Sequence, residues 1–364
     1  MKRCKSVSAL LLILCLCLSL MGCVGVQTPD ISYHDETFFA MDTAMSLRVY
    51  VDHDGALCGE LRQLVEELGR QLSAAEEGSA LSLLNNSGET DNAHIAALCK
   101  LGREISARTG GALDITLLPA SRAWGFPGKN YRIPSPLELK DLAAVTGMEH
   151  LQLTEGGVRL DSGSAVDLGA LAKGYAADLC RQVLEDRKRS GILSLGGNIQ
   201  TVGDKPDGSD WVVGIQDPDN ANAFALVLSF KGSKAVVTSG DYQRYFELDG
   251  KRYCHILNPE TLSPVSGDLR SVTVVADSGA LADGLSTALF VMGKDRALEL
   301  WRASDDFEAI FISQDGTVTV TEGLAGLVSE CEFTVVNRLK QGRGKSRQKR
   351  GCCCWGLCLF CWPV

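Results

Sequence analysis

The sequence predicts an α+β fold, and three observations lead to this prediction. Helix-like and strand-like segments are interleaved along the 364 residues without a regular βαβ repeat, which argues against a doubly wound parallel sheet. The sequence contains no Gly-rich dinucleotide fingerprint after a strand and no internal repeat. Beyond the N-terminal segment, roughly 300 residues remain, enough for one large domain with a sizeable core. We therefore expect a single domain with mixed helices and antiparallel-rich sheets.

The N-terminal segment has the layout of a secretory signal. Three cations precede an apolar run over residues 10–20, and Cys23 follows a small residue, as in a bacterial lipobox. This predicts a lipoprotein signal peptide over residues 1–22, lipid on Cys23 and a tether over residues 23–34. A simple secretory peptide or a short membrane anchor is the alternative, although the run is marginal for a spanning helix. The mature protein is expected to be extracytoplasmic and lipid-anchored to the bacterial cell membrane.

Apolar periodicity predicts two helices in the first third of the domain. The first is marked by the residues Leu57, Leu61, Leu64, Val65, Leu68 and Leu72. A polar break over residues 85–88 follows, and a second helix continues to about Ser106. The Pro-rich residues 126–136 are expected to form a loop over a ligand.

Later segments rich in β-branched and aromatic residues predict strands. They cover residues 151–153, 211–215, 224–230, 235–238, 271–275, 309–312 and 317–320.

The segment VDLGALAKGYA, residues 166–176, has the features of an oxyanion site. Its apolar residues follow helical spacing from Leu168 onward, which predicts a helix packed on the core. Asp167 stands where an N-cap would, and Lys173 lies near the same helix start, which attracts anions. This arrangement suits a phosphorylated ligand; an ordinary capped helix with a solvated lysine is the alternative.

A second segment, residues 276–293, predicts a helix that can bind a cation. Asp283 and Thr287 are four residues apart and therefore share one helical face, with Ser286 beside them. Oxygen ligands of this kind favour magnesium or calcium over zinc. The alternative is that the acid caps the helix and the hydroxyls bond back to its carbonyls.

Seven segments in order resemble the ApbE-type flavin transferases, which move FMN from FAD onto a protein threonine using magnesium. They are FFAMDTAMSLRVY (38–50), GGALDITLLPASRAWGF (110–126), VDLGALAKGYA (166–176), LSLGGNIQTVG (193–203), TSGDYQRYF (238–246), HILNPETLSPV (255–265) and ADGLSTALFVMG (282–293). The first resembles the opening strand of that family. The resemblance spans roughly residues 35–330 and implies one T-fold-related domain with an FAD site in a cleft.

The resemblance also implies roles for individual residues. The magnesium ligands are expected to be the Ala170 carbonyl, Asp283 and Thr287, with Ser286 contributing. His255 and Asp283 are the expected proton-transfer groups. The expected FAD contacts are Met41, Ala112, Leu113, Asp114, Asp167, Lys173 and Ile256.

The expected reaction is magnesium-dependent transfer of FMN from FAD to a threonine, with AMP leaving. The resemblance implies acceptors with an Asp-x-x-Ser/Thr-Gly-Ala-Ser/Thr segment in extracytoplasmic redox complexes, of the NADH:quinone reductase or Rnf type. Two alternatives remain open. A magnesium-dependent FAD pyrophosphatase would use water at the same site, and a flavin-binding lipoprotein would not turn over.

One turn departs from the family pattern. The family has His-Ile-x-Asp-Pro followed by Thr-Gly, whereas this chain has Asn258-Pro259 and Thr261-Leu262. If the turn keeps its shape, Leu262 must adopt the positive φ that glycine adopts without strain.

Charge argues against nucleic-acid binding. The whole chain carries a net charge of −9, but its two ends hold ten cations. Without these ten, 26 cations face 45 acidic residues, so the central part has a net charge of −19.

Cysteine use is uneven. The five cysteines of the body, Cys58, Cys99, Cys180, Cys254 and Cys331, are scattered and predicted to be buried free thiols. The basic, Cys-rich tail over residues 338–364 lies outside the resemblance and matches no zinc-site spacing. We expect an extension of unknown role.

Overall fold

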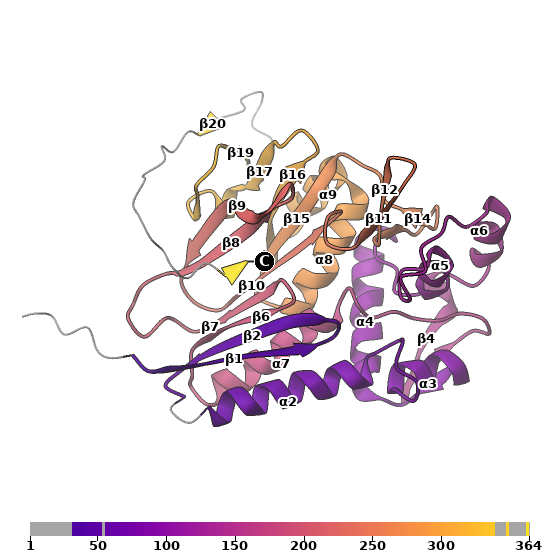
Figure 1. The fold of residues 1–364 in the computed structure, drawn as a ribbon, viewed down its shortest axis with the longest axis horizontal. Helices are drawn as coiled ribbons and strands as arrows, with labels where there is room; N and C mark the ends of the chain where they lie inside the picture. Colours follow the sequence, from indigo (N-terminus) through magenta and orange to yellow (C-terminus); the bar gives the residue numbers. More distant parts are fainter. Residues whose placement is uncertain (1–30, 53–54, 339–346, 349–361, 364) are drawn as a thin grey trace, which may run out of the picture.

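A ten-stranded, mostly antiparallel sheet runs through the molecule (Figure 1). The computed structural model describes residues 31–52, 55–338, 347–348 and 362–363. In spatial order the strands are β1 (Tyr33–Ala40), β2 (Thr43–Tyr50), β6 (Gly191–Leu195), β7 (Asn198–Val202), β10 (Lys234–Gly240), β15 (Leu269–Ala276), β16 (Phe307–Ser313), β17 (Val318–Thr321), β19 (Phe333–Val336) and β20 (Arg347–Gln348). Only the β17–β19 pair within this sheet is parallel. The signal peptide, Cys23 and most of the tail lie outside the described residues.

Smaller sheets flank the large one. One contains β18 (Val328–Ser329), β9 (Asn220–Phe230), β8 (Trp211–Asp217) and β21 (Trp362–Pro363). Another contains β3 (Glu89–Thr90), β5 (Gly157–Leu160) and β4 (Leu151–Thr154). Two hairpins complete the set: β11 (Tyr245–Leu248) with β12 (Lys251–Cys254), and β13 (Leu257–Asn258) with β14 (Ser263–Pro264). The seven predicted strand segments coincide with strands β4, β8, β9, β10, β15, β16 and β17.

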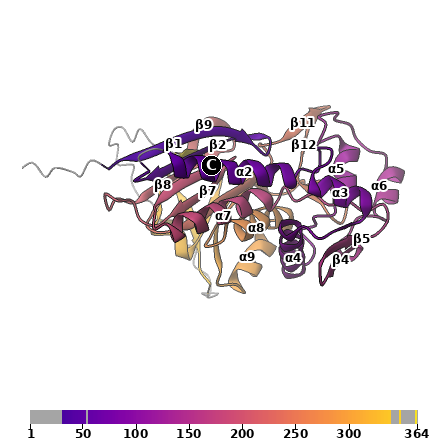
Figure 2. The ribbon, with the colours of Figure 1, turned by 90° about the horizontal axis from the view of Figure 1, so that it is seen from below.

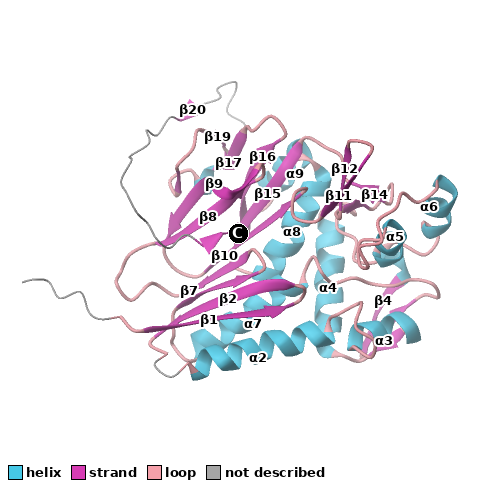
Figure 3. Cartoon of the chain, viewed as in Figure 1, coloured by secondary structure: helices cyan, strands magenta, loops and turns pink. Residues whose placement is uncertain are grey.

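Helices cover one face of the large sheet. The α-helices are α2 (Ala56–Gln71), α3 (Ala80–Ser87), α4 (Ala93–Arg108), α5 (Leu118–Trp124), α6 (Pro136–Leu142), α7 (Ala172–Asp186), α8 (Gly279–Met292) and α9 (Lys294–Arg302), with 3-10 turns at Met148–His150 and Glu322–Leu324. Figure 2 shows α7, α8 and α9 along this face. Figure 3 shows α3, α5, α6 and β4 gathered at one end of the molecule. Among the described residues, no helix has the length and apolar character needed to cross a membrane.

Alternating side chains of the large sheet build two cores. Leu193 packs in the core shared with the helices, whereas its neighbour Ile192 packs in a second core with Trp211 of β8. Val274 and Val275 divide between the two cores in the same way. Successive strand side chains point to opposite faces, so each central strand is buried on both sides. The result is a three-layer domain, and it has the α+β class that the sequence predicts.

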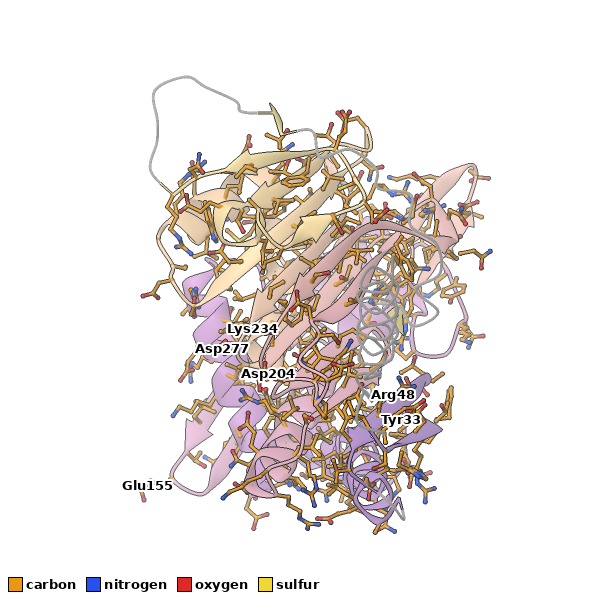
Figure 4. All side chains as sticks on the ribbon, turned by 90° about the vertical axis from the view of Figure 1, so that its left-hand side faces the viewer. Tyr33, Arg48, Glu155, Asp204, Lys234 and Asp277 are labelled. Carbon is orange, nitrogen blue, oxygen red and sulfur yellow. The ribbon has the colours of Figure 1, made fainter. Side chains whose placement is uncertain are left out.

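Polar contacts join neighbouring strands and loops of the large sheet (Figure 4). Lys234, at the start of β10, lies 2.7 Å from the Asp277 carboxylate, and Asp204 accepts a hydrogen bond from the Gly232 N–H at 2.8 Å. On β2, the Arg48 guanidinium lies over the Tyr33 ring at 4.1 Å.

Two expectations about the first third of the domain were wrong. The expected single opening strand is a hairpin, because Met41 and Asp42 have φ values of 46° and 61° and form a tight turn between β1 and β2. The expected polar break begins too early, since residues 85–87 form the last turn of α3 and Gly88 caps it with a φ of 83°. The loop over residues 126–135 is present, and Pro136 begins α6.

The cysteines of the body are free thiols, as predicted. Cys58, Cys99, Cys180 and Cys254 are buried, whereas Cys331 is only partly buried. Burial raises the pKa of Cys58, Cys99 and Cys180 to about 12. These thiols therefore remain protonated and act as small core residues.

Candidate active site

The start of α7 differs from the expected capped helix. The helix begins at Ala172 rather than Leu168, because residues 169–171 form a turn. Asp167 is consequently not an N-cap; its Oδ1 accepts a hydrogen bond from the Gly169 N–H at 2.8 Å, inside this turn. Lys173 lies in the first turn of α7, where its Nζ donates to the Gly169 carbonyl at 3.2 Å. The first helical amides therefore lack a side-chain cap from their own segment.

Two glycines let α7 and α8 cross in direct backbone contact. A Cβ atom on Gly174 would lie 2.1 Å from the Gly279 carbonyl oxygen, and one on Gly279 would lie 2.5 Å from the Gly174 oxygen. No side chain fits at either position. This crossing brings Asp283 of α8 to the first turn of α7, where its Oδ2 accepts from the Gly174 N–H at 3.0 Å.

This contact leaves a backbone carbonyl open. In a regular helix the Gly174 N–H would bond to Ala170, four residues earlier. It donates to Asp283 instead, and no other backbone amide of the described residues donates to the Ala170 carbonyl. Asp283 is only 4% exposed, yet its Oδ1 has no hydrogen-bond partner in the described part of the chain. An unpaired carbonyl and a half-satisfied carboxylate thus lie around one helical turn.

The hydroxyls of α8 join a small network with β10. Ser239 Oγ lies 2.8 Å from Ser286 Oγ and 3.2 Å from Thr287 Oγ1. Ser286 also donates to the Asp283 carbonyl at 2.9 Å and is fully buried, so its hydroxyl is already occupied. Thr287 bonds to the same carbonyl only at 3.4 Å and is the more available of the two. The hydroxyls of Ser286 and Thr287 therefore do bond back to a carbonyl of their own helix, as the alternative interpretation predicts, while the Asp283 carboxylate stays partly unpaired.

The segment over residues 112–117 lies directly beside the turn before α7. The Asp167 N–H donates to the Ile115 carbonyl at 2.8 Å, and Leu117 forms a parallel bridge with Ala165. This pairing places Asp114 near Asp167. Asp114 Oδ1 accepts from the Thr116 N–H at 2.7 Å, and burial raises the pKa of Asp114.

The other expected FAD contacts within this region are apolar. Leu113 lies in the core, where a Cβ on Gly284 of α8 would be 3.4 Å from its Cδ2. Ala112 is also buried, and Ile256 is 6% exposed, with its carbonyl accepting from the Val265 N–H at 2.9 Å. The α8 face next to Asp283 thus packs on the segment that carries Asp114.

His255 follows β12 and pairs with Arg244, which precedes β11. The His255 N–H donates to the Arg244 carbonyl at 2.9 Å, and the ring Nδ1 lies 3.2 Å from the same oxygen. Burial lowers the pKa of His255 to about 4, with the Arg244 and Lys173 cations acting in the same direction. The imidazole is therefore neutral near pH 7. An Nδ1–H bonded to the carbonyl leaves Nε2 free to accept a proton.

Met41 lies at the β1–β2 turn. It packs on α2, where a Cβ on Gly69 would be 3.2 Å from Met41 Cγ. The neighbouring Thr43 approaches the β6–β7 turn so closely that a Cβ on Gly196 would be 2.3 Å from its Cγ2. Gly196 and Gly197 have φ values of 64° and 93°, so this Gly-Gly turn and the Met41 turn are neighbours.

The turn at Leu262, which differs in sequence from the family pattern, has the backbone shape that glycine usually adopts. Leu262 has a φ of 52°, as expected if the turn is preserved. This conformation costs about 1 kcal/mol for a residue with a Cβ. The Leu262 side chain is 3% exposed and shares a small core with Trp124, whose Nε1 donates to the Leu262 carbonyl at 2.8 Å. Burial offsets the strain, and Trp124 fills this core.

The oxygen donors at the α7–α8 crossing form no acidic cluster. Within the described residues, no group of three or more His, Cys, Asp or Glu side chains could hold a metal ion. A carboxylate, a carbonyl and a hydroxyl are nonetheless hard oxygen donors, and Mg²⁺ commonly uses one or two carboxylates together with substrate phosphates and water. The donor set fits such an ion and does not fit zinc.

Two residues important to this arrangement were not singled out from the sequence. Ser239, within TSGDYQRYF, joins the α8 hydroxyls. Asp178 of α7 binds the first turn of α8, accepting from Ser278 Oγ, Gly279 N–H and Ala280 N–H at 2.7, 2.7 and 3.0 Å. Ser239 could have been found from its motif, whereas Asp178 carries no sequence signal beyond an acid on a helix.

Comparison with known proteins identifies the family. The family model described as the ApbE family matches residues 41–311. The chain belongs to the ApbE family. This confirms the family predicted from the seven segments, and with it the expectation of a transferase enzyme.

Individual ApbE relatives agree. The FAD:protein FMN transferase of Vibrio cholerae serotype O1 is 34% identical over 254 residues, which are 67% of this chain and 76% of that protein. That of Escherichia coli K12 is 35% identical over 244 residues, 64% of this chain and 69% of that protein. The crystal structure of the ApbE protein from Thermotoga maritima has a TM-score of 0.77 and 30% identity, covering 82% of this chain and all of that one.

Proposed function

We propose that this protein transfers FMN from FAD to a threonine hydroxyl of an acceptor protein, in a magnesium-dependent reaction that releases AMP. Relatives named FAD:protein FMN transferase support the reaction class. The observation that carries the proposal is the α7–α8 crossing. It binds the Asp283 carboxylate to the N–H of Gly174, the residue after Lys173, and leaves the Ala170 carbonyl without a backbone donor among the described residues.

Asp283, Thr287 and the Ala170 carbonyl would hold the magnesium ion. Bound there, Mg²⁺ would neutralise negative charge on the FAD phosphates and on the leaving AMP. Lys173 would add a point charge at the same helix start, and the N-terminal end of a helix favours an anion. Met41, Ala112, Leu113, Asp114, Asp167 and Ile256 would complete the FAD contacts.

Side chains of this protein would accept the proton that the acceptor hydroxyl loses. The acceptor threonine oxygen attacks the phosphorus of the FMN moiety, and the bond from that phosphorus to the bridging oxygen of AMP breaks, so AMP leaves with the bonding pair. His255 would take the hydroxyl proton on Nε2, since Nδ1 is held at the Arg244 carbonyl. Asp283 is the second expected proton acceptor.

Lipid on Cys23 would anchor the enzyme to the extracytoplasmic face of the bacterial membrane. Its acceptors would be domains of membrane redox complexes that carry the Asp-x-x-Ser/Thr-Gly-Ala-Ser/Thr segment.

The test is mass spectrometry of an acceptor protein with an Asp-x-x-Thr-Gly-Ala-Thr segment, incubated with FAD, Mg²⁺ and the enzyme. The expected result is one added FMN on that threonine, lost with EDTA. Free FMN and AMP without adduct would establish the pyrophosphatase instead, and unchanged FAD would leave a binding protein. Full magnesium-dependent activity in Asp283→Ala and Thr287→Ala variants would contradict the metal assignment.

A further inference from the structure

The β11–β12 hairpin adjoins His255 of the candidate site, whose imidazole is also near the Lys173 cation. It leaves the site at Arg244 and returns to it at His255, so both ends of the hairpin are fixed at one backbone pair, 2.9 Å between N and O. A protein segment that brings a hydroxyl to His255 would therefore meet the residues at the base of this hairpin. This position makes the hairpin a candidate surface for acceptor recognition.

Stacked aromatic rings hold the hairpin rigidly. The Phe246 ring stacks on Tyr253 with centroids 5.0 Å apart and on Tyr131 of the 126–135 loop at 4.9 Å. Tyr253 in turn contacts the buried Trp124 at 5.6 Å. The stack runs from the core to the surface, so the hairpin is pre-organised and loses little entropy when it binds a partner.

The outer side of this stack exposes apolar surface next to unpaired charge. The exposed large apolar residues here are Tyr131, Ile133, Leu137, Tyr245 and Leu248, with exposures of 39–68%. Arg244 forms no ion pair with any described residue, whereas Arg252 on the same hairpin pairs with Glu247 at 3.3 Å and lies over the Tyr245 ring at 4.2 Å. Apolar area around an unpaired guanidinium fits a peptide segment with an acidic side chain better than it fits a nucleotide.

We propose that the β11–β12 hairpin and the 126–135 loop dock the acceptor protein, with Arg244 binding a carboxylate of its acceptor segment. This inference rests on the proposed function. Binding the carboxylate at Arg244 places the neighbouring hydroxyl near Nε2 of His255. Arg244 is thus a positioning and specificity residue.

The test measures acceptor KM, kcat and FAD affinity in the full-length enzyme. Arg244→Gln is expected to raise the acceptor KM about 5- to 10-fold, equivalent to losing one charge-assisted contact, with FAD affinity unchanged. Arg252→Gln is the matched control, because its charge is already paired, and should stay within about twofold. Arg244→Lys keeps the charge beside His255, so it should keep the wild-type pH profile. Its acceptor KM should lie between those of the wild type and Arg244→Gln.

A charge exchange makes the test specific. An acceptor whose segment carries Lys in place of Asp should react poorly with the wild type and better with Arg244→Glu. Unchanged acceptor KM in Arg244→Gln, or weaker FAD binding in that variant, would overturn the inference, the latter by making Arg244 a phosphate ligand. If the wild type forms no adduct with any acceptor, the proposed function itself fails, and this inference with it.

Discussion

Asp178 and Asp283 are two acids on crossing helices, and each reaches the first turn of the other helix. Asp178 of α7 accepts three hydrogen bonds from the start of α8, which uses both of its oxygens. Asp283 of α8 accepts one bond from α7 and keeps Oδ1 unpaired among the described residues, although it is the more buried of the two. A carboxylate that is saturated with backbone donors stabilises a fold; one left half-satisfied in a buried position is available to a ligand.

The largest effect is expected at Asp283. Asp283→Asn keeps an oxygen for the Gly174 N–H but loses the charge, so kcat for FMN transfer should fall about 10²–10³-fold while the melting temperature changes little. Steady-state kinetics together with calorimetry check this. The matched variant Asp178→Asn should lower the melting temperature and leave kcat nearly unchanged. Comparable activity losses in both variants would remove the distinction between the two acids.

The crossing itself is tested by Gly174→Ala. The added methyl would meet the Gly279 backbone at 2.1 Å, so the helices must separate, at a cost of about 3 kcal/mol. Urea denaturation measures the loss, and activity should fall with it because Asp283 loses its position. Gly59→Ala in α2, where a Cβ meets nothing within 4 Å, is the control and should be neutral or slightly stabilising. A fully stable and active Gly174→Ala enzyme would contradict the role assigned to the crossing.

Asp178→Ala should cost about 1–2 kcal/mol of stability, as expected for a lost helix cap. Below the melting transition the folded fraction should retain transfer activity, which separates this acid from Asp283. Asp186→Ala removes an exposed acid at the other end of α7 and should change stability by less than about 0.5 kcal/mol. An inactive but stable Asp178→Ala protein would show that Asp178 has a role beyond capping.

The smallest effect is expected from the protonation of His255, which lies near the Arg244 and Lys173 cations. Its folded-state pKa of about 4 is below the ordinary value of 6.5. Between these values the unfolded chain binds more protons, so stability is full above pH 6.5 and falls as the pH drops toward 4. We expect a loss of about 1 kcal/mol between pH 7 and pH 5, allowing for partial exposure. Urea titrations at both pH values check this, and a His255→Gln variant with the same slope would refute it.

Much of the fold could be predicted from short-range patterns. The seven strand segments follow from β-branched and aromatic runs, and α2 and α8 from apolar spacing, because alternation and helical periodicity are local properties. The Met41–Asp42 turn could not be found in this way. Neither residue is a glycine, and only the pairing of β1 with β2 over eight residues imposes the positive φ values.

The candidate site shows the same division. Asp283, Thr287 and Lys173 were identified because helical spacing or motif position marks them. Asp167 was assigned the wrong local role, since the Gly169–Ala170 turn delays the helix and turns its carboxylate to Gly169. Asp178 gave no signal by itself, as its importance comes from the start of α8, about 100 residues away in the chain.

The sequence by itself determined the family, the α+β class and the shared helical face of Asp283 and Thr287, because these depend on residues close together in the chain. Only the tertiary structure decided which groups stay unpaired. The Gly174 amide meets a carboxylate 109 residues away, and that single contact frees the Ala170 carbonyl. Such a contact depends on two glycine backbones touching across two helices, and no local pattern specifies that approach.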